Sequence, residues 1–144
     1  MSLKDAKNKM SKSDPSDASR INLTDTEEQI HNKIKKAKTD TKSFPENEKD
    51  LTKRPEIQNL IGIYSSLKSQ KITTTLKEFQ GKNFSNFKEK LSEVVIENIS
   101  PISKEISKLK SDKGHILQVL KDGSEKAEAI ASEKVKKIKE IIGF

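Results

Sequence analysis

Length, composition and charge restrict this chain to a small, lysine-rich domain with a thin core. It has 144 residues, of which 31% are hydrophobic and 35% charged, so its apolar residues must be phased on helix faces to form a core. Its net charge of +7 favours phosphate-rich partners, and the lack of cysteine excludes disulfides and cysteine-ligated metal sites.

The N-terminal segment is polar and is expected to form a loop. It contains the pentapeptide Lys9-Met10-Ser11-Lys12-Ser13, in which two lysines lie three residues apart. A lysine ammonium is a compact charge on a long stem and suits triphosphate oxygens, and serine hydroxyls add hydrogen-bond donors. The pattern predicts a mobile polyphosphate clamp. In so lysine-rich a chain, the alternative is a solvated surface loop without a ligand.

A capped amphipathic helix and a polar stretch are expected next. Thr24 and Glu27 have the spacing of a capping box, and the helix behind them is predicted to run to about Lys38. Its apolar face consists of Ile30, Ile34 and Ala37. Residues 39–54 are predicted to be a linker or an extended surface loop. Asp40 either braces the helix against the clamp loop or belongs to a turn at the helix end.

Three further helices are predicted from Pro55 onward, because proline suits the first position of a helix. The first has the apolar residues Ile57, Leu60, Ile61, Tyr64 and Leu67. A shorter one is expected to start at Thr73 or Thr74 and to stop at Gly81. The third has the apolar residues Phe84, Phe87, Leu91, Val94, Val95 and Ile99.

The last third of the chain is also predicted to be helical. Pro101 either kinks the third helix or follows Ser100 as the cap of a new one. A turn is expected at 111–114, followed by a brief helix that ends at Gly123. The final helix has an apolar stripe made of Ala127, Ile130, Ala131, Val135, Ile138 and Ile142. Because glutamates interleave with its lysines, packing in a bundle is favoured over a membrane surface.

Four sequence blocks resemble a known family. KMSKS resembles the second signature of the class I aminoacyl-tRNA synthetases, and the text after it, SDPSDASRINLTD, resembles the tryptophanyl-tRNA synthetase family. The other blocks follow in the same order and are KIKKAKTDT at 33–41, LKEFQGKNFSNFKEKL at 76–91 and VLKDGSEKAEAIASEKVKKIKEIIGF at 119–144. The resemblance therefore extends over nearly the whole chain.

The resemblance implies an ATP-dependent ligase that joins tryptophan to its tRNA. Lys9 and Lys12 would then be the catalytic pair that stabilises the β- and γ-phosphates of ATP. Ser11 and Ser13 would supply hydrogen bonds within the loop, and Met10 would anchor it by packing. ATP would bring Mg²⁺ with it, and no metal site is expected in this chain.

The resemblance also implies an arrangement of parts. The expected fold is an all-α helical bundle preceded by a KMSKS loop left over from a Rossmann-type catalytic domain. The expected boundaries are 1–20 for the loop, 21–54 for the capped helix and linker, and 55–144 for a tRNA-binding helical domain. tRNA(Trp) is the expected partner. Family members are homodimers, but the chain alone is expected to be a monomer.

Other parts of a class I site are missing from the sequence. There is no HIGH-type motif, since His31 precedes Asn32 and His115 follows Gly114, and there is no glycine-rich phosphate loop or βαβ pattern. The expectation is therefore that the chain is the C-terminal part of such an enzyme and is inactive alone. ATP and tryptophan would be held by an N-terminal half.

Two other functions remain open from the residues alone. One is a non-catalytic RNA-binding module with a basic helical face, and the other is a structural interaction bundle. The sequence has no apolar run of the ~18 residues that a membrane helix needs and no signal-peptide pattern at its start. A cytoplasmic protein without a membrane partner is therefore expected.

Overall fold

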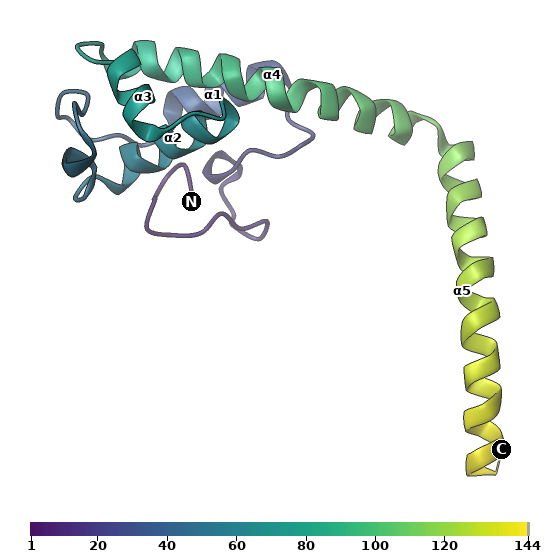
Figure 1. Cartoon of the computed structure of the whole chain (residues 1–144). Coiled ribbons are helices and arrows are strands. Elements are labelled where there is room, and N and C mark those ends of the chain that lie inside the picture. Colours follow the sequence, from purple (N-terminus) through teal and green to yellow (C-terminus); the bar gives the residue numbers. More distant parts are fainter. Residues whose placement is uncertain (144) are drawn as a thin grey trace. The chain divides into compact units, whose positions relative to one another are not determined.

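The computed structural model describes residues 1–143, which contain helices and turns but no strand (Figure 1). This confirms the all-α prediction. The α-helices are α1 (Glu27–Lys36), α2 (Pro55–Leu67), α3 (Ile72–Glu78), α4 (Phe84–Ser111) and α5 (Lys113–Ile142). Two short 3-10 helices are η1 (Asp17–Ser19) and η2 (Glu48–Leu51). The chain divides into a compact N-terminal unit, Met1–Lys104, and a second unit from Glu105 onward.

Helix α1 begins two residues later than the capping pattern predicted. Thr26, not Thr24, is the cap: its hydroxyl accepts from the Gln29 amide at 3.2 Å, and the Gln29 side chain accepts from the Thr26 amide at 2.8 Å. Both threonines have a suitable residue three positions later. The Thr26 box forms because Asp25 is buried and closes a turn by accepting from the Asn22 amide at 2.8 Å.

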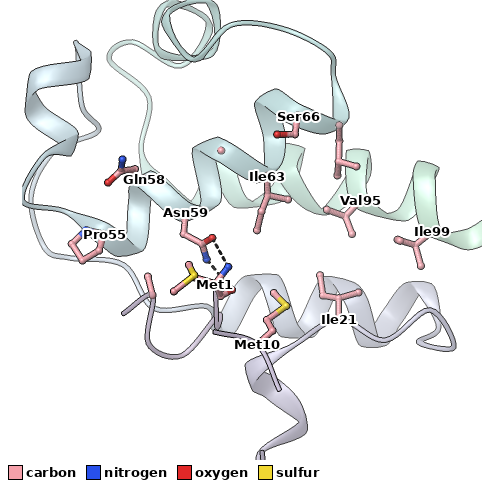
Figure 2. Close-up of a pocket in the computed structure, with 13 residues that line it drawn as sticks. Met1, Met10, Ile21, Pro55, Gln58, Asn59, Ile63, Ser66, Val95 and Ile99 are labelled. Atoms are coloured by element: carbon pink, nitrogen blue, oxygen red, sulfur yellow. Dashed lines mark hydrogen bonds between the residues drawn. The ribbon is translucent and has the colours of Figure 1, made fainter. Parts of the chain in front are cut away.

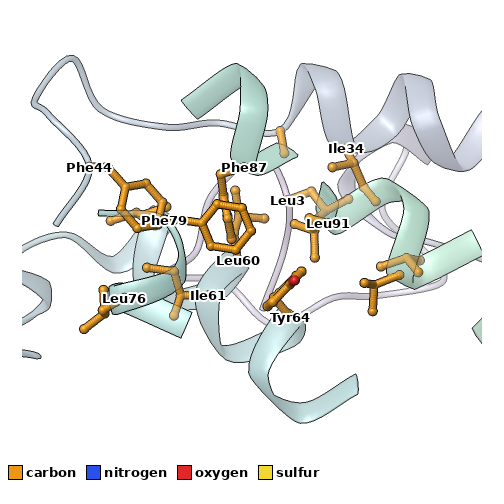
Figure 3. Close-up of a cluster of buried hydrophobic side chains, with 14 of the residues drawn as sticks. Leu3, Ile34, Phe44, Leu60, Ile61, Tyr64, Leu76, Phe79, Phe87 and Leu91 are labelled. Atoms are coloured by element: carbon orange, nitrogen blue, oxygen red, sulfur yellow. The ribbon is translucent and has the colours of Figure 1, made fainter. Parts of the chain in front are cut away.

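The core of the N-terminal unit is built around aromatic rings from three elements and one loop (Figure 3). Phe87 of α4 lies 5.0 Å from Phe79 and 5.2 Å from Phe44, measured between ring centroids, and Tyr64 lies 5.2 Å from Phe79. Such tilted and edge-on pairs add to the free energy gained from burial. Phe44 is only 5% exposed, so the prediction of a surface loop at 39–54 is wrong at this residue.

The N-terminal segment lacks regular structure except at η1, yet it is anchored to the helices. The Leu3 side chain is 3% exposed and belongs to the core. The Leu3 backbone accepts from the Lys38 amide at 2.8 Å and donates to the Ser19 carbonyl at 2.9 Å. The segment that carries the KMSKS pentapeptide is therefore held at the end of α1.

Helix α4 continues through Pro101. The alternative in which Ser100 caps a new helix is wrong, because Ser100 is itself helical and its hydroxyl donates to the Glu27 carboxylate at 2.6 Å. That bond, together with the Lys104–Glu27 ion pair of 3.3 Å, joins α4 to the start of α1.

In the second unit, α5 is one continuous helix from Lys113 to Ile142, so the predicted break at Gly123 is wrong. The Asp112 carboxylate caps it by accepting from the His115 amide at 2.9 Å. One mid-helix glycine costs only about 1 kcal/mol, and the strong helix formers around it outweigh that cost. No residue of α5 is buried, so this unit has no core of its own and the packing of the apolar stripe stays a prediction.

Candidate functional site

The KMSKS pentapeptide forms an exposed loop in the N-terminal unit. Lys9, Ser11, Lys12 and Ser13 are exposed, whereas Met10 is partly buried and packs against the hydrophobic core. No ion pair within residues 1–143 involves Lys9 or Lys12. Both ammonium groups are therefore presented to solvent by a loop that an apolar side chain anchors.

The serines of the pentapeptide shape the loop. The Ser11 hydroxyl accepts from the Ser13 amide at 3.2 Å and lies 2.9 Å from the Ser13 hydroxyl. The Asp14 amide donates to the Ser11 carbonyl at 3.3 Å, which closes a turn with Lys12 inside it. The serines bond to each other here, and the exposed Lys12 lies within the turn that they shape.

The Arg20 guanidinium binds the backbone of this turn. Its Nη1 donates to the carbonyl oxygens of Ser11, Asp14 and Ser16, at 3.3, 3.0 and 3.5 Å. Its Nη2 lies 3.2 Å from the Asp17 carboxylate. Sequence reasoning missed this residue. The available signal was composition, because Arg20 is one of only two arginines in a chain whose other basic residues are lysines and two histidines.

Asp17 connects the loop to helix α1. One carboxylate oxygen faces Arg20, and the other lies 2.6 Å from the ammonium of Lys33. Hydrogen bonds from Lys33 and Asn22 hold the pKa of Asp17 below its ordinary value. Burial alone would lower the pKa of Lys33, but the bonds to Asp17 and Asp25 outweigh it and raise that pKa. Both pKa shifts favour the charged forms, so Asp17 and Lys33 stay an ion pair at neutral pH.

Asp40 is paired with Arg54 and does not brace the clamp loop. The Arg54 guanidinium donates to both of its carboxylate oxygens, at 2.7 and 2.8 Å. Asp40 also accepts from the Lys42 amide at 2.9 Å, which confirms the alternative of a turn near the helix end. The Arg54 guanidinium holds the pKa of Asp40 below its ordinary value.

An apolar cavity of about 650 Å³ lies next to the loop (Figure 2). Met10 forms part of its wall, together with Ile21 and with side chains from α2 and α4 such as Ile63 and Ile99. At its rim, the Met1 ammonium donates to the Asn59 side chain at 3.1 Å. Its largely apolar lining does not suit phosphate, so only the exposed lysines offer phosphate chemistry here.

The histidines and carboxylates form no metal centre in the part of the chain that the structure describes. Within residues 1–143, no three or more His, Cys, Asp or Glu side chains are grouped so that they could hold a metal ion. His31 instead lies 3.1 Å from the Ser92 hydroxyl. In the same residues, no helix has the length and apolar character needed to span a membrane.

The comparison with protein families decides the relationship. The family described as tRNA synthetases class I (W and Y) matches residues 1–100. The chain belongs to this synthetase family. Its KMSKS loop, the brace formed by Arg20 and the core around Phe87 all lie within the matched residues.

Individual synthetases are similar along the whole chain. It is 47% identical over 144 residues to the tryptophan–tRNA ligase of Brucella melitensis and 49% identical to that of Rickettsia felis. Both alignments include all of this chain but only 41% and 43% of the two ligases. The chain thus spans about two fifths of the length of these curated relatives.

A solved synthetase structure shares the fold. The tryptophanyl-tRNA synthetase of Mycoplasma pneumoniae matches with a TM-score of 0.61, covering 100% of this chain and 45% of that one. At 24% sequence identity this similarity concerns the fold alone.

Proposed function

We propose that this chain is the C-terminal, KMSKS-bearing part of a tryptophan–tRNA ligase. The supporting observation is that relatives named tryptophan–tRNA ligase align with all 144 residues at 47–49% identity. In the complete enzyme, tryptophan attacks the α-phosphorus of ATP through a carboxylate oxygen and pyrophosphate leaves. The tryptophanyl group of the adenylate then passes to a hydroxyl of the terminal adenosine of tRNA(Trp), and AMP is released.

Lys9 and Lys12 stabilise the departing pyrophosphate in this proposal. Negative charge grows on the β-phosphate as the bond to the α-phosphorus breaks, and two ammonium groups near it lower the energy of the transition state. Both side chains are exposed, and no ion pair of the described residues occupies them. Mg²⁺ enters with the nucleotide and shares this charge.

tRNA(Trp) binds along the helical part of the chain. Helix α5 carries the exposed lysines Lys134, Lys136, Lys137 and Lys139. Binding through several phosphates should weaken steeply with salt. The complete enzyme acts as a homodimer in the cytoplasm. This chain alone is a monomer. It has no ligase activity, because the rest of the relatives' length holds adenosine and tryptophan.

A chimeric ligase tests this function. This chain replaces the matching two fifths of the Rickettsia felis ligase, and ATP–pyrophosphate exchange is measured with tryptophan and with tyrosine. The proposal predicts exchange that depends on tryptophan and charging of tRNA(Trp). A folded chimera that binds tRNA without any exchange, while the unmodified Rickettsia felis ligase is active, contradicts it. That outcome would favour a non-catalytic RNA-binding module.

A further inference from the structure

We propose that Arg20 is a positioning residue that fixes the backbone of the KMSKS loop, so that Lys12 is presented in one place and the loop of the free chain is less mobile than the sequence pattern predicted. The effect on phosphate binding rests on the proposed function, whereas the effect on loop order does not. The Arg20 side chain is only 18% exposed, and its guanidinium contacts the backbone carbonyls of the turn. It therefore acts through the backbone that carries Lys12 and does not itself contact phosphate.

Apart from Arg20, few bonds hold the backbone of this loop. Between Ser11 and Ser16 the loop is outside any α-helix and has no strand to pair with. Its internal bonds are short-range ones, such as Ser16 to the Asp14 carboxylate at 2.7 Å and Asp14 to the Ser11 carbonyl at 3.3 Å. Outside the loop, the Lys4 ammonium donates to the Ser16 hydroxyl at 3.2 Å, which holds only the last residue of the loop. Fixing a backbone costs conformational entropy at every residue, so these few bonds alone would leave residues 11–14 mobile.

The guanidinium supplies a longer-range constraint. One nitrogen of Arg20 donates to the carbonyls of Ser11, Asp14 and Ser16, with the shortest distance, 3.0 Å, at Asp14. Hydrogen bonds from a charged donor are about twice as strong as neutral ones, and the planar fork of arginine has fixed donor directions. A single cation thus ties together the carbonyls on both sides of Lys12 and Ser13.

The fork is itself held on its other sides. Its Nε donates to the Asn22 side chain at 3.2 Å, and its Nη2 faces Asp17 at 3.2 Å. Asp17 is joined to Lys33 of α1 at 2.6 Å, and the Lys33 side chain is only 9% exposed. Arg20 and Asp17 thereby connect the backbone after Met10 to a buried group on helix α1, in addition to the packing of Met10 against the core.

The chain offers a matched control, since Arg54 is its only other arginine. Arg54 also binds one carboxylate, Asp40, and one backbone carbonyl, that of Ser43 at 2.8 Å. Arg54→Met removes the same charge and the same kind of bonds elsewhere in the N-terminal unit. A general loss of stability or of charge would therefore affect both variants.

Backbone order parameters of this chain, measured by ¹⁵N relaxation, test the inference. We expect values near those of a rigid backbone, about 0.85, for Ser11, Ser13 and Asp14 in the natural chain. In Arg20→Met we expect them to fall below about 0.6, with Ile30 and Leu60 unchanged. Arg20→Lys keeps the charge but not the fork, so its values should fall nearly as far, and Arg54→Met should leave the loop unchanged.

Tripolyphosphate binding, followed by the same amide signals, separates this inference from the proposed function. Arg20→Met should weaken binding about tenfold, because a mobile loop must be ordered first. If Lys9→Ala/Lys12→Ala binds tripolyphosphate as well as the natural chain, the proposed function fails. Unchanged order parameters in Arg20→Met, a loop that is already mobile in the natural chain, or full restoration by lysine would each overturn the role of Arg20.

Discussion

Lys33 and Asp17 form an ion pair with a nitrogen–oxygen distance of 2.6 Å, and it joins the segment after the KMSKS loop to helix α1. The same ammonium lies 2.6 Å from Asp25, whose side chain is 5% exposed. Lys33 therefore neutralises one buried and one exposed carboxylate at once. A buried charge that loses its partner is costly, which makes this pair a point where the fold of the loop region can be tested.

Lys33→Met should destabilise the N-terminal unit. Removing the ammonium leaves the buried Asp25 carboxylate without its cation, and such losses cost about 3–5 kcal/mol. Denaturant unfolding of the variant measures the change. Lys36→Met, three residues later in α1 and exposed, is the control and should change the free energy of unfolding by less than about 0.5 kcal/mol. Equal effects of the two substitutions would contradict the network.

The Asp40–Arg54 pair should make stability depend on pH in acid. Because Arg54 holds the folded-state pKa of Asp40 below its ordinary value, the pair contributes stability above about pH 4, the unfolded value. That contribution is lost as the pH falls through the folded-state pKa. Asp17 shifts in the same direction. Asp40→Asn should be less stable at pH 7 and should lose less on acidification. An acid decline as steep as that of the natural chain would argue against this assignment.

Leu3→Ala should loosen the N-terminal segment from the helices. The Leu3 side chain is 3% exposed within the core, so its truncation should cost about 2–5 kcal/mol, measured by denaturant unfolding. Amide exchange at Lys38, whose amide donates to the Leu3 carbonyl at 2.8 Å, should accelerate as well. Leu23→Ala is the control, since Leu23 is 51% exposed. No difference between the two variants would mean that the segment is not anchored there.

These anchors show where sequence reasoning succeeded and where it could not. Periodic apolar spacing predicted the helices at Ile57–Leu67 and Phe84–Ile99, since one face of each is buried in the core. Leu3 and Phe44 are isolated apolar residues in polar stretches, and burial of an isolated side chain has no periodic signal. Only the folded chain shows which long-range partner they meet.

In the candidate site, too, the sequence predicted one part and missed another. The KMSKS pentapeptide is contiguous, so the order of its residues is enough to mark it as a motif. Arg20, Asp17 and Lys33 lie outside it, Asp17 pairs with Lys33 sixteen residues further on, and this pairing depends on how the chain turns at Asp25. Two overlapping capping boxes made that turn ambiguous, and the choice of Thr26 over Thr24 was settled by the burial of Asp25.

A glycine inside α5 and the glycine that follows this helix should respond oppositely to alanine. Gly123 lies in the middle of the helix with nothing within 4 Å of an added Cβ, so Gly123→Ala should stabilise α5 by about 1 kcal/mol. Gly143 follows the helix with φ +83°, which favours glycine, so Gly143→Ala should fray the last turn. Amide exchange along α5 measures both changes. If Gly123→Ala speeds exchange, α5 is not continuous at this residue.

The most direct test of the synthetase account is adenylate formation by Lys9→Ala/Lys12→Ala in the chimeric ligase. The control is Lys49→Ala/Lys53→Ala, which removes two exposed lysines of the same unit away from the loop. Loss of one transition-state charge donor typically costs 10²–10³-fold, so the account predicts at least about a 100-fold slower step for the loop variant, with tRNA affinity nearly intact and the control unchanged. An undiminished rate, or a loss of tRNA affinity in place of the rate, would contradict it.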